Sequence, residues 1–305
     1  MKPTVFIHTN DFQMLGARLS KHSLERASEH ADRFEVRFLR YEDQPHLAGR
    51  VGQRYLRRKD KWVAWNDANP QSFTPLRFLP PQLMGFQGRA LVIDPDVFAV
   101  GDVWPLLDRD MDGKALMCRR VETPGKRPFL ASSVMLLDCE KLRHWRWDEQ
   151  IDEMFRGERP YRPWINLELE PEENIGFVER WWNDLDHLDD STVLLHFTRR
   201  LTQPWKTGLP LGGVEEGKIA SKGRTLLDRL LGRNPKHRRN PDPRQESFFF
   251  DLLADALAAG AVGRDDLQRE IDDGNLRPDV FDVLDRRPVP PRAAETPIRS
   301  DLRSA

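Results

Sequence analysis

The sequence has few cysteines and no excess of basic charge, and each absence excludes a class of protein. Cys118 and Cys139 are the only cysteines among 305 residues, too few for a disulfide framework or for a zinc site built on two cysteine pairs. We expect both to be reduced, buried thiols. Lys and Arg number 48 and Asp and Glu 49, so the chain lacks the basic excess that binds nucleic acid. Nucleic acid is therefore not an expected partner.

No segment has the length and hydrophobicity of a membrane span or an export signal. The longest apolar stretch, 248–262, is interrupted by Asp251 and Asp255 and is too short to cross a bilayer. The first ten residues contain only three consecutive apolar residues, whereas a signal peptide needs a longer apolar core. We therefore expect a soluble, cytoplasmic protein.

Charge and composition change along the chain and suggest its organisation. We expect an α/β domain over 1–215, a basic connector over 216–245, a helical segment over 246–287 and a disordered tail over 288–305. Residues 218–244 carry nine Lys or Arg against two Asp. Such a segment could contact an anionic membrane from the cytoplasmic side, although a solvated connector is the simpler interpretation.

Apolar patterning in the first part of the chain predicts alternating strands and helices. A strand over Thr4–His8, a helix over Met14–Arg26 and a strand over Phe34–Leu39 form a β-α-β unit. The run Arg89–Asp94, which is apolar from Ala90 to Ile93, is typical of a central parallel strand buried on both faces. Further strands are expected over 116–119, 133–138 and 192–197, and further helices over 139–147, 245–260, 265–273 and 279–285.

The most informative residues are Asp94 and Asp96, which stand where the strand Arg89–Asp94 stops. Ligands of open α/β sheets gather outside the carboxyl ends of the strands, so two carboxylates there face a crevice. Such a pair can hold Mg²⁺ or Mn²⁺, whose coordination shell is often completed by substrate phosphates. A simple turn around Pro95 is the alternative interpretation of this fragment.

Other polar residues are expected to reach the same crevice. Arg77 precedes the strand by about one helix and can contact a phosphate or a base. His196 ends another buried strand and is either a core residue or a third metal ligand. Beyond it, Arg199, Arg200 and Lys206 supply positive charge for a leaving diphosphate.

Several of these stretches resemble one family in the same order along the chain. They look like the core of the family 8 glycosyltransferases of GT-A fold, the glycogenin and galactosyltransferase type, and the resemblance spans about residues 4 to 210. The matching stretches are Phe73–Pro80, Arg89–Phe98, Asp102–Leu106, Ser132–Asp138, Trp182–Asn183 and His196–Lys206. The resemblance implies a Rossmann-like mixed sheet flanked by helices, here followed by a small C-terminal helical extension.

The resemblance also implies roles for individual residues. Asp94, Asp96 and His196 would hold Mn²⁺ or Mg²⁺. The nucleotide diphosphate sugar, by resemblance a UDP-sugar, would meet a set of residues from four segments: Thr9, Asn10, Asp11, Arg77, Ser132, Arg199, Arg200 and Lys206. Glu168 and Glu172 are candidates for the group near the reacting carbon, and Lys206 for the catalytic cation. The sugar would pass to an unidentified glycan, lipid or protein acceptor with retention of configuration.

The chain departs from the family pattern at several places near this site, and two of them concern groups that would hold the donor. Ala131-Ser132-Ser133 stands where the family has Asn-x-Gly, and Gln203 stands where it has a phosphate-binding lysine. These departures motivate a first alternative, a GT-A-like protein that binds a nucleotide sugar or glycan without turnover. A second alternative is a phosphatase of the haloacid-dehalogenase type, in which Asp94 would be the nucleophile and Asp96 the acid or base.

Overall fold

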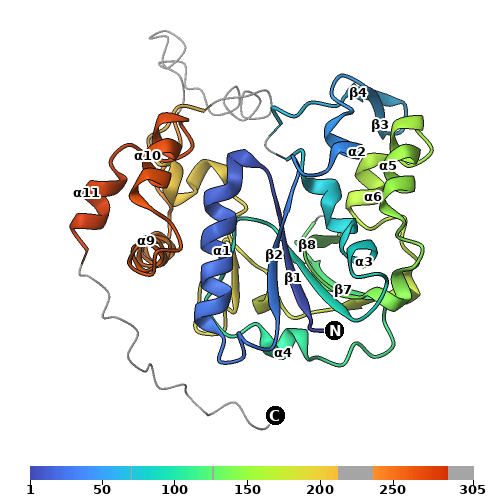
Figure 1. Ribbon diagram of the computed structural model, residues 1–305, viewed down its shortest axis with the longest axis horizontal. Helices are drawn as coiled ribbons and strands as arrows, with labels where there is room; N and C mark the ends of the chain where they lie inside the picture. The colour runs from blue at the N-terminus through green and yellow to red at the C-terminus, as the bar shows by residue number, and fades with distance from the viewer. Residues whose placement is uncertain (70, 126, 212–235, 288–305) are drawn as a thin grey trace.

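The computed structural model describes residues 1–69, 71–125, 127–211 and 236–287. Its centre is a six-stranded sheet with the order β2-β1-β5-β8-β7-β9 and helices on both sides (Figure 1). The strands are β1 (Thr4–Thr9), β2 (Glu35–Arg40), β5 (Arg89–Ile93), β7 (Leu116–Val121), β8 (Phe129–Asp138) and β9 (Ile175–Phe177). β1 is parallel to β2 and β5, whereas β8 is antiparallel to β5 and β7. The predicted mixed α/β sheet is confirmed, with β5 parallel to its neighbour on one side only.

The first strand of the opening β-α-β unit contributes side chains to the cores on both faces of this sheet. Val5 and Ile7 of β1 face a cluster that includes Ala17 and Leu24 of α1 (Met14–Ala27). Phe6 points to the opposite cluster, which is rich in aromatic residues. Because successive side chains of a strand point to opposite faces, a fully apolar strand supplies both cores.

Two smaller sheets complete the strand arrangement. One has the order β10-β11-β6, with β10 (Asp184–Leu185), β11 (Leu194–His196) and β6 (Val97–Ala99). The other is a hairpin of β3 (Arg54–Arg58) and β4 (Lys61–Ala64), within a basic stretch whose pairing the sequence pattern did not reveal. Three residues, Asp94 to Asp96, separate the end of β5 from the start of β6, so the chain passes from the large sheet into the small one at the aspartates.

Short helices cover the aromatic side of the large sheet. They are α2 (Pro45–Ala48), η2 (Thr74–Phe78), α3 (Pro80–Leu83), η3 (Cys139–Leu142), α5 (Trp147–Arg156) and α6 (Tyr161–Ile165), while α4 (Trp104–Leu107) packs at the other face. The helix expected over 139–147 is wrong, because the backbone is extended at Arg146, between η3 and α5. Trp145 and Trp147 are both buried in one cluster. Since residues two apart in a helix do not share a side, burying both requires this break.

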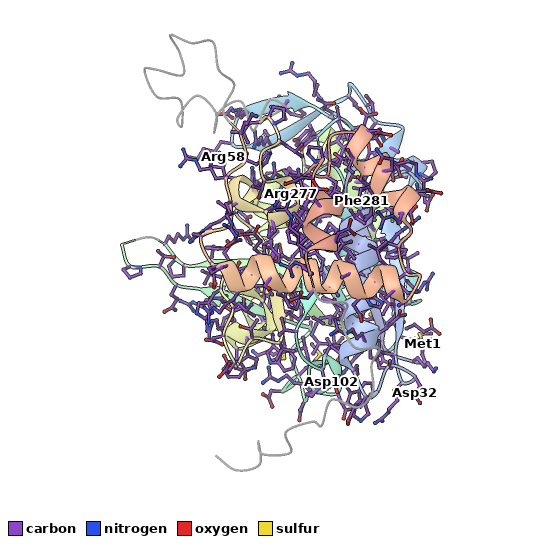
Figure 2. All side chains as sticks on the ribbon, turned by 90° about the vertical axis from the view of Figure 1, so that its left-hand side faces the viewer. Met1, Asp32, Arg58, Asp102, Arg277 and Phe281 are labelled. Atoms are coloured by element: carbon purple, nitrogen blue, oxygen red, sulfur yellow. The ribbon has the colours of Figure 1, made fainter. Side chains whose placement is uncertain are left out.

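The C-terminal helices pack on the opposite flank of the molecule. They are α9 (Pro243–Ala258), α10 (Arg264–Asp272) and α11 (Val280–Asp285), and they lie beside α1 in Figure 1. Figure 2 looks onto this flank, where Arg277 and Phe281 are labelled. Phe249, Phe250 and Leu253 share a core cluster with Phe98 of β6 and Leu195 of β11. His22 of α1 and Asp255 of α9 add an ion pair at 2.7 Å.

Some sequence predictions concern segments outside the described residues. The tail 288–305 lies there entirely, and the basic segment 218–244 lies there up to residue 235. Among the described residues, no helix combines the length and the apolar character needed to cross a bilayer. Cys118 and Cys139 are buried and unbonded, as expected. Burial raises the pKa of each thiol to about 12.

Candidate active site

The register of the large sheet places the first aspartate beside a histidine. Ile7 pairs with Ile93, so His8 and Asp94 are the next residues at the carboxyl ends of β1 and β5. The His8 Nε2 atom lies 2.9 Å from the Asp94 Oδ1 atom. The His8 side chain is fully buried, and this burial outweighs the attraction of Asp94, so the pKa of His8 is lowered.

Arg77 of η2 holds the same aspartate through a bidentate ion pair. Its Nη2 atom lies 2.7 Å from Oδ1 and 2.6 Å from Oδ2 of Asp94, and its Nη1 atom donates to Ser132 Oγ at 2.8 Å. Burial would raise the pKa of Asp94, but the charge of Arg77 and the hydrogen bond with His8 outweigh it and hold that pKa well below its usual range. Asp94 is therefore a fixed carboxylate.

A tight approach of α1 shapes the turn between the two aspartates. Gly16 lies so close to the turn that a β-carbon there would stand 2.8 Å from the Pro95 carbonyl oxygen. Two buried serines of α1 fix the strand that follows, since Ser20 Oγ donates to the Val97 carbonyl at 2.6 Å and Ser23 Oγ accepts from Ala99 N at 2.8 Å. The helix thus positions Asp96, which directly precedes β6.

The antiparallel pairing of β6 with β11 brings His196 to the aspartates. His196 pairs with Val97, and its Nε2 atom lies 3.2 Å from Asp96 Oδ1 and 4.0 Å from Asp94 Oδ2. Burial disfavours the charged imidazole, yet the carboxylates of Asp96 and Asp94 outweigh burial and raise the pKa of His196. The side chain is 7% exposed. The predicted convergence of the three residues is therefore present.

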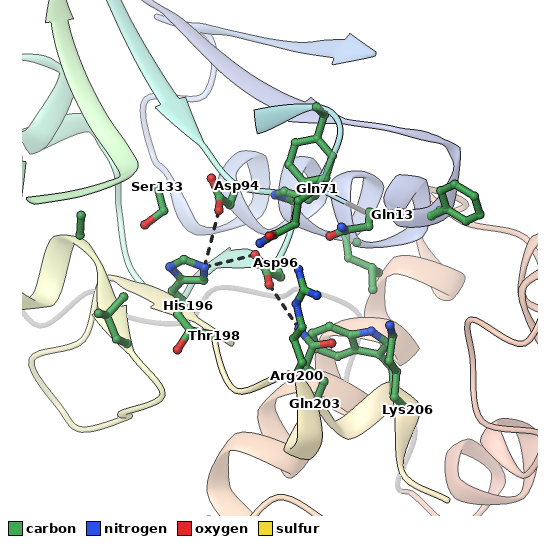
Figure 3. A pocket seen from close by; sticks show the side chains of 18 of the residues that line it. Gln13, Gln71, Asp94, Asp96, Ser133, His196, Thr198, Arg200, Gln203 and Lys206 are labelled. Carbon is green, nitrogen blue, oxygen red and sulfur yellow. Dashed lines mark hydrogen bonds and ion pairs between the residues drawn. The ribbon is translucent and has the colours of Figure 1, made fainter. Parts of the chain in front are cut away.

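These three residues offer ligand atoms that lie within 4.8 Å of one another. Two carboxylates and one imidazole suit Mn²⁺ or Mg²⁺ in their chemistry. The arrangement fits a divalent cation because Asp96 and His196 turn their nearest ligand atoms toward each other (Figure 3). A second acidic group, formed by Asp184, His187 and Asp189, already contains the guanidinium of Arg180, which pairs with Asp184 and Asp189.

The three residues stand at one wall of a cavity of about 370 Å³. That volume is within the range of small-molecule sites. Arg200 and Lys206 line the same cavity, and they extend on the side of Asp96 opposite Ser133 (Figure 3). The cavity therefore has a carboxylate wall and a cationic wall, an arrangement that suits a ligand carrying a metal-bound anion.

The structure brings some of the predicted nucleotide-binding residues to this cavity. Those that line it are Arg77, Ser132, Arg200 and Lys206. At the loop after β1, the described cavity wall is formed by Phe12 and Gln13 rather than by Thr9, Asn10 and Asp11. Thr9 and Asn10 are buried, while the Asp11 carboxylate pairs with Arg40 at 2.7 Å.

Three further predicted residues stand away from the described cavity wall. Arg199 points toward Asp186, with its Nε atom 3.7 Å from that carboxylate. Glu168 and Glu172 are exposed, and the cavity is lined instead by Asn166, whose amide donates to Glu168 Oε1 at 3.2 Å. The roles suggested for these three residues stay predictions.

Sequence reasoning missed several residues that form or support the site. His8 had a signal, because it ends a strand parallel to the one that ends at Asp94. Asn183 belonged to the matching stretch Trp182–Asn183 but was given no role there, and Gly16 had no signal that could be separated from that of an ordinary helix residue. Glu270 and Asn275 also line the cavity, although they belong to the C-terminal helical segment, and their position depends wholly on tertiary packing.

Comparison with known proteins gives weak similarity only. No protein-family model and no curated protein matches the sequence. The glycosyltransferase GlyE from Streptococcus pneumoniae is 14% identical over 77% of this chain and 65% of its own, with a TM-score of 0.48. The galactosyltransferase LgtC, solved with donor and acceptor sugar analogues, is 14% identical over 75% and 99%, with a TM-score of 0.43. Mouse xyloside xylosyltransferase 1 is 13% identical over 65% and 98%, with a TM-score of 0.42. Similarity this low carries no functional argument, so function has to be argued from the site itself.

Proposed function

We propose that this chain is a metal-dependent glycosyltransferase that takes a nucleotide diphosphate sugar, by resemblance a UDP-sugar, as its donor. The observation that carries the proposal is the convergence of Asp94, Asp96 and His196 at one wall of a cavity whose other wall carries Arg200 and Lys206. When bound, Mn²⁺ or Mg²⁺ would neutralise charge on the departing diphosphate. The acceptor is a glycan, lipid or protein, and the resemblance favours transfer with retention.

The chain's own residues would perform three tasks in this reaction. Asp94, Asp96 and His196 would hold the ion, and Arg77 keeps Asp94 ionised and fixed. Lys206 follows Pro204 and Trp205 in η7 (Pro204–Lys206), so its flexible ammonium stands on a rigid support beside the cavity. It would stabilise the negative charge that develops as the diphosphate leaves. The carboxylates that line the described cavity are Asp94, Asp96 and Glu270.

One observation favours the alternative of binding without turnover. Arg77 already contacts both oxygens of Asp94, so part of the site's negative charge is neutralised before any ion enters. The same contact argues against the phosphatase alternative, because a nucleophilic aspartate needs an oxygen free to attack phosphorus. Hydrolysis of a UDP-sugar in the presence of Mn²⁺ distinguishes turnover from binding alone.

The metal site is tested by thermal stability measured with UDP, with and without Mn²⁺. A ligand at a hundred times its dissociation constant stabilises the native state by about 2.7 kcal/mol. We expect Mn²⁺-dependent stabilisation in the wild type and its loss in Asp96→Ala. Asp43→Ala is the matched control, because its carboxylate is 61% exposed and pairs with Arg40. Full Mn²⁺-dependent stabilisation in a folded Asp96→Ala variant would refute the site.

A further inference from the structure

An outer layer of hydrogen-bonded side chains surrounds the proposed metal ligands. We propose that Asn183 and Gln203 are positioning residues that orient His196 and Asp96, and that Ser133 anchors Asn183. The inference rests on the proposed function, since it concerns how the chain would prepare its metal ligands. It goes further by assigning roles to residues whose side chains lie behind the ligands.

The contact of His196 with Asn183 determines which ring nitrogen faces the aspartates. The Asn183 side chain is fully buried, and its Nδ2 atom donates to Ser133 Oγ at 3.0 Å. This bond orients the amide so that Oδ1 faces His196 Nδ1, also at 3.0 Å. Nδ1 must therefore carry a proton and donate it. The remaining nitrogen, Nε2, faces Asp96 and Asp94 as a metal ligand would.

Gln203 plays the corresponding part for Asp96. The side chain is 6% exposed, and its Nε2 atom donates to Asp96 Oδ2 at 3.2 Å and to the Phe197 carbonyl at 3.0 Å. Both amide hydrogens are thereby used, which holds Asp96 with Oδ1 toward His196, as Figure 3 shows. The Gln203 amide therefore donates to the Asp96 carboxylate and has no further N–H group with which to donate to a diphosphate.

Ser133 and Gln203, which depart from the resembled family pattern, thus both form hydrogen bonds in the layer behind the proposed metal ligands. Glycine at position 133 could not accept a hydrogen bond from Asn183 through a side chain. A lysine at position 203 would place a charge against Asp96 and would leave the Phe197 carbonyl without the amide that now contacts it. The residues present at 133 and 203 instead complete contacts to His196 and Asp96.

The experiment uses the full chain and Mn²⁺ alone as the probe. Electron paramagnetic resonance measures the affinity from free Mn²⁺, and its pulsed form detects the nitrogen of a coordinated imidazole. Asn183→Leu is expected to lower Mn²⁺ affinity by about 10–100-fold, the usual effect of losing such a partner, and to weaken the nitrogen signal. Asn183→Asp is expected to restore both, because a carboxylate also accepts from Nδ1. Gln203→Leu should lower affinity but keep the nitrogen signal.

Asn174→Leu is the matched control, since it also removes a buried or half-buried side-chain amide. The Asn174 amide donates to Glu170 at 2.7 Å, and neither residue is among the described residues that line the cavity. The control variant should keep wild-type affinity. If Asn183→Leu is as stable as the control and binds Mn²⁺ with unchanged affinity and nitrogen signal, the inference is overturned. If Asn183→Leu does not fold, Ser133→Ala decides, because unchanged affinity and nitrogen signal there also overturn it. Wild-type protein that binds Mn²⁺ without a nitrogen signal overturns the proposed metal centre itself, and the inference with it.

Discussion

Replacing Phe249 tests whether the C-terminal helices are part of the domain that carries the site. Phe249 of α9 is 2% exposed and packs against Trp205, with ring centroids 4.8 Å apart, and against Phe98 at 5.9 Å. Truncating a buried phenylalanine to alanine costs about 3–5 kcal/mol. For a chain of this size, each kcal/mol lost from the free energy of unfolding lowers the melting temperature by roughly 2–4 °C. We therefore expect Phe249→Ala to lower it by about 6–20 °C.

The assay is thermal unfolding followed by calorimetry and by circular dichroism. A single transition is expected in the variant as in the wild type, because Phe249 shares its core cluster with β6 and β11. Phe177→Ala is the control, since Phe177 is 49% exposed on the edge strand β9. Its change in unfolding free energy should stay within about 0.5 kcal/mol.

A different unfolding pattern would refute this reasoning. If Phe249→Ala creates a separate early transition and leaves the main one unchanged, the C-terminal helices form an independent module. Two truncations of the chain test the same question, whether the C-terminal helices are part of the domain. Removal of residues after Asn240 should cause aggregation, because it exposes the apolar surface that α9 covers, whereas removal of 288–305 should change neither stability nor activity.

Two further predictions concern single side chains at the cavity. Lys206→Ala should raise the activation free energy of donor hydrolysis by roughly 2–4 kcal/mol with little change in nucleotide affinity. Arg199→Ala, whose side chain points toward Asp186, is measured beside it. Normal turnover in Lys206→Ala would refute the role of Lys206, and loss of turnover in Arg199→Ala alone would assign that role to the arginine. Burial raises the pKa of Glu270, so its contribution to stability is present below the unfolded pKa and is lost as pH rises through the folded pKa. Glu270→Gln should therefore melt at a higher temperature than the wild type at neutral pH, with a smaller difference at acidic pH; a difference independent of pH would contradict it.

The features that the sequence could predict are those that depend on local pattern. The strand before Asp94 is apolar from Ala90 to Ile93, so its place in the sheet and the position of the aspartates at its carboxyl end followed from this pattern. Arg77 and His196 reach the same place because each stands at the end of an element that packs there. The sequence left open whether His196 is a core residue or a metal ligand. The 3.2 Å between its Nε2 atom and Asp96 Oδ1 favours the ligand.

The features that the sequence could not predict depend on pairing between distant segments. Asn183 meets His196 only because β10 pairs with β11, and a two-residue strand leaves no periodic signal. Glu270 reaches the cavity through the packing of the C-terminal helices, which no local pattern specifies. The break at Arg146 likewise reflects the burial of Trp145 and Trp147 in one cluster, where tertiary packing overrides a helical pattern.

The charges at the cavity limit which ligands it can hold. Asp94 and Asp96 bring two negative charges and Arg77 one positive charge, so the wall is net negative whenever His196 is neutral, and it then repels a bare diphosphate. Arg200 and Lys206 on the other wall attract the same group. A diphosphate can satisfy both walls only with a cation between it and the aspartates. We therefore expect Mn²⁺ and nucleotide to bind with positive coupling, each raising the affinity of the other by the same factor.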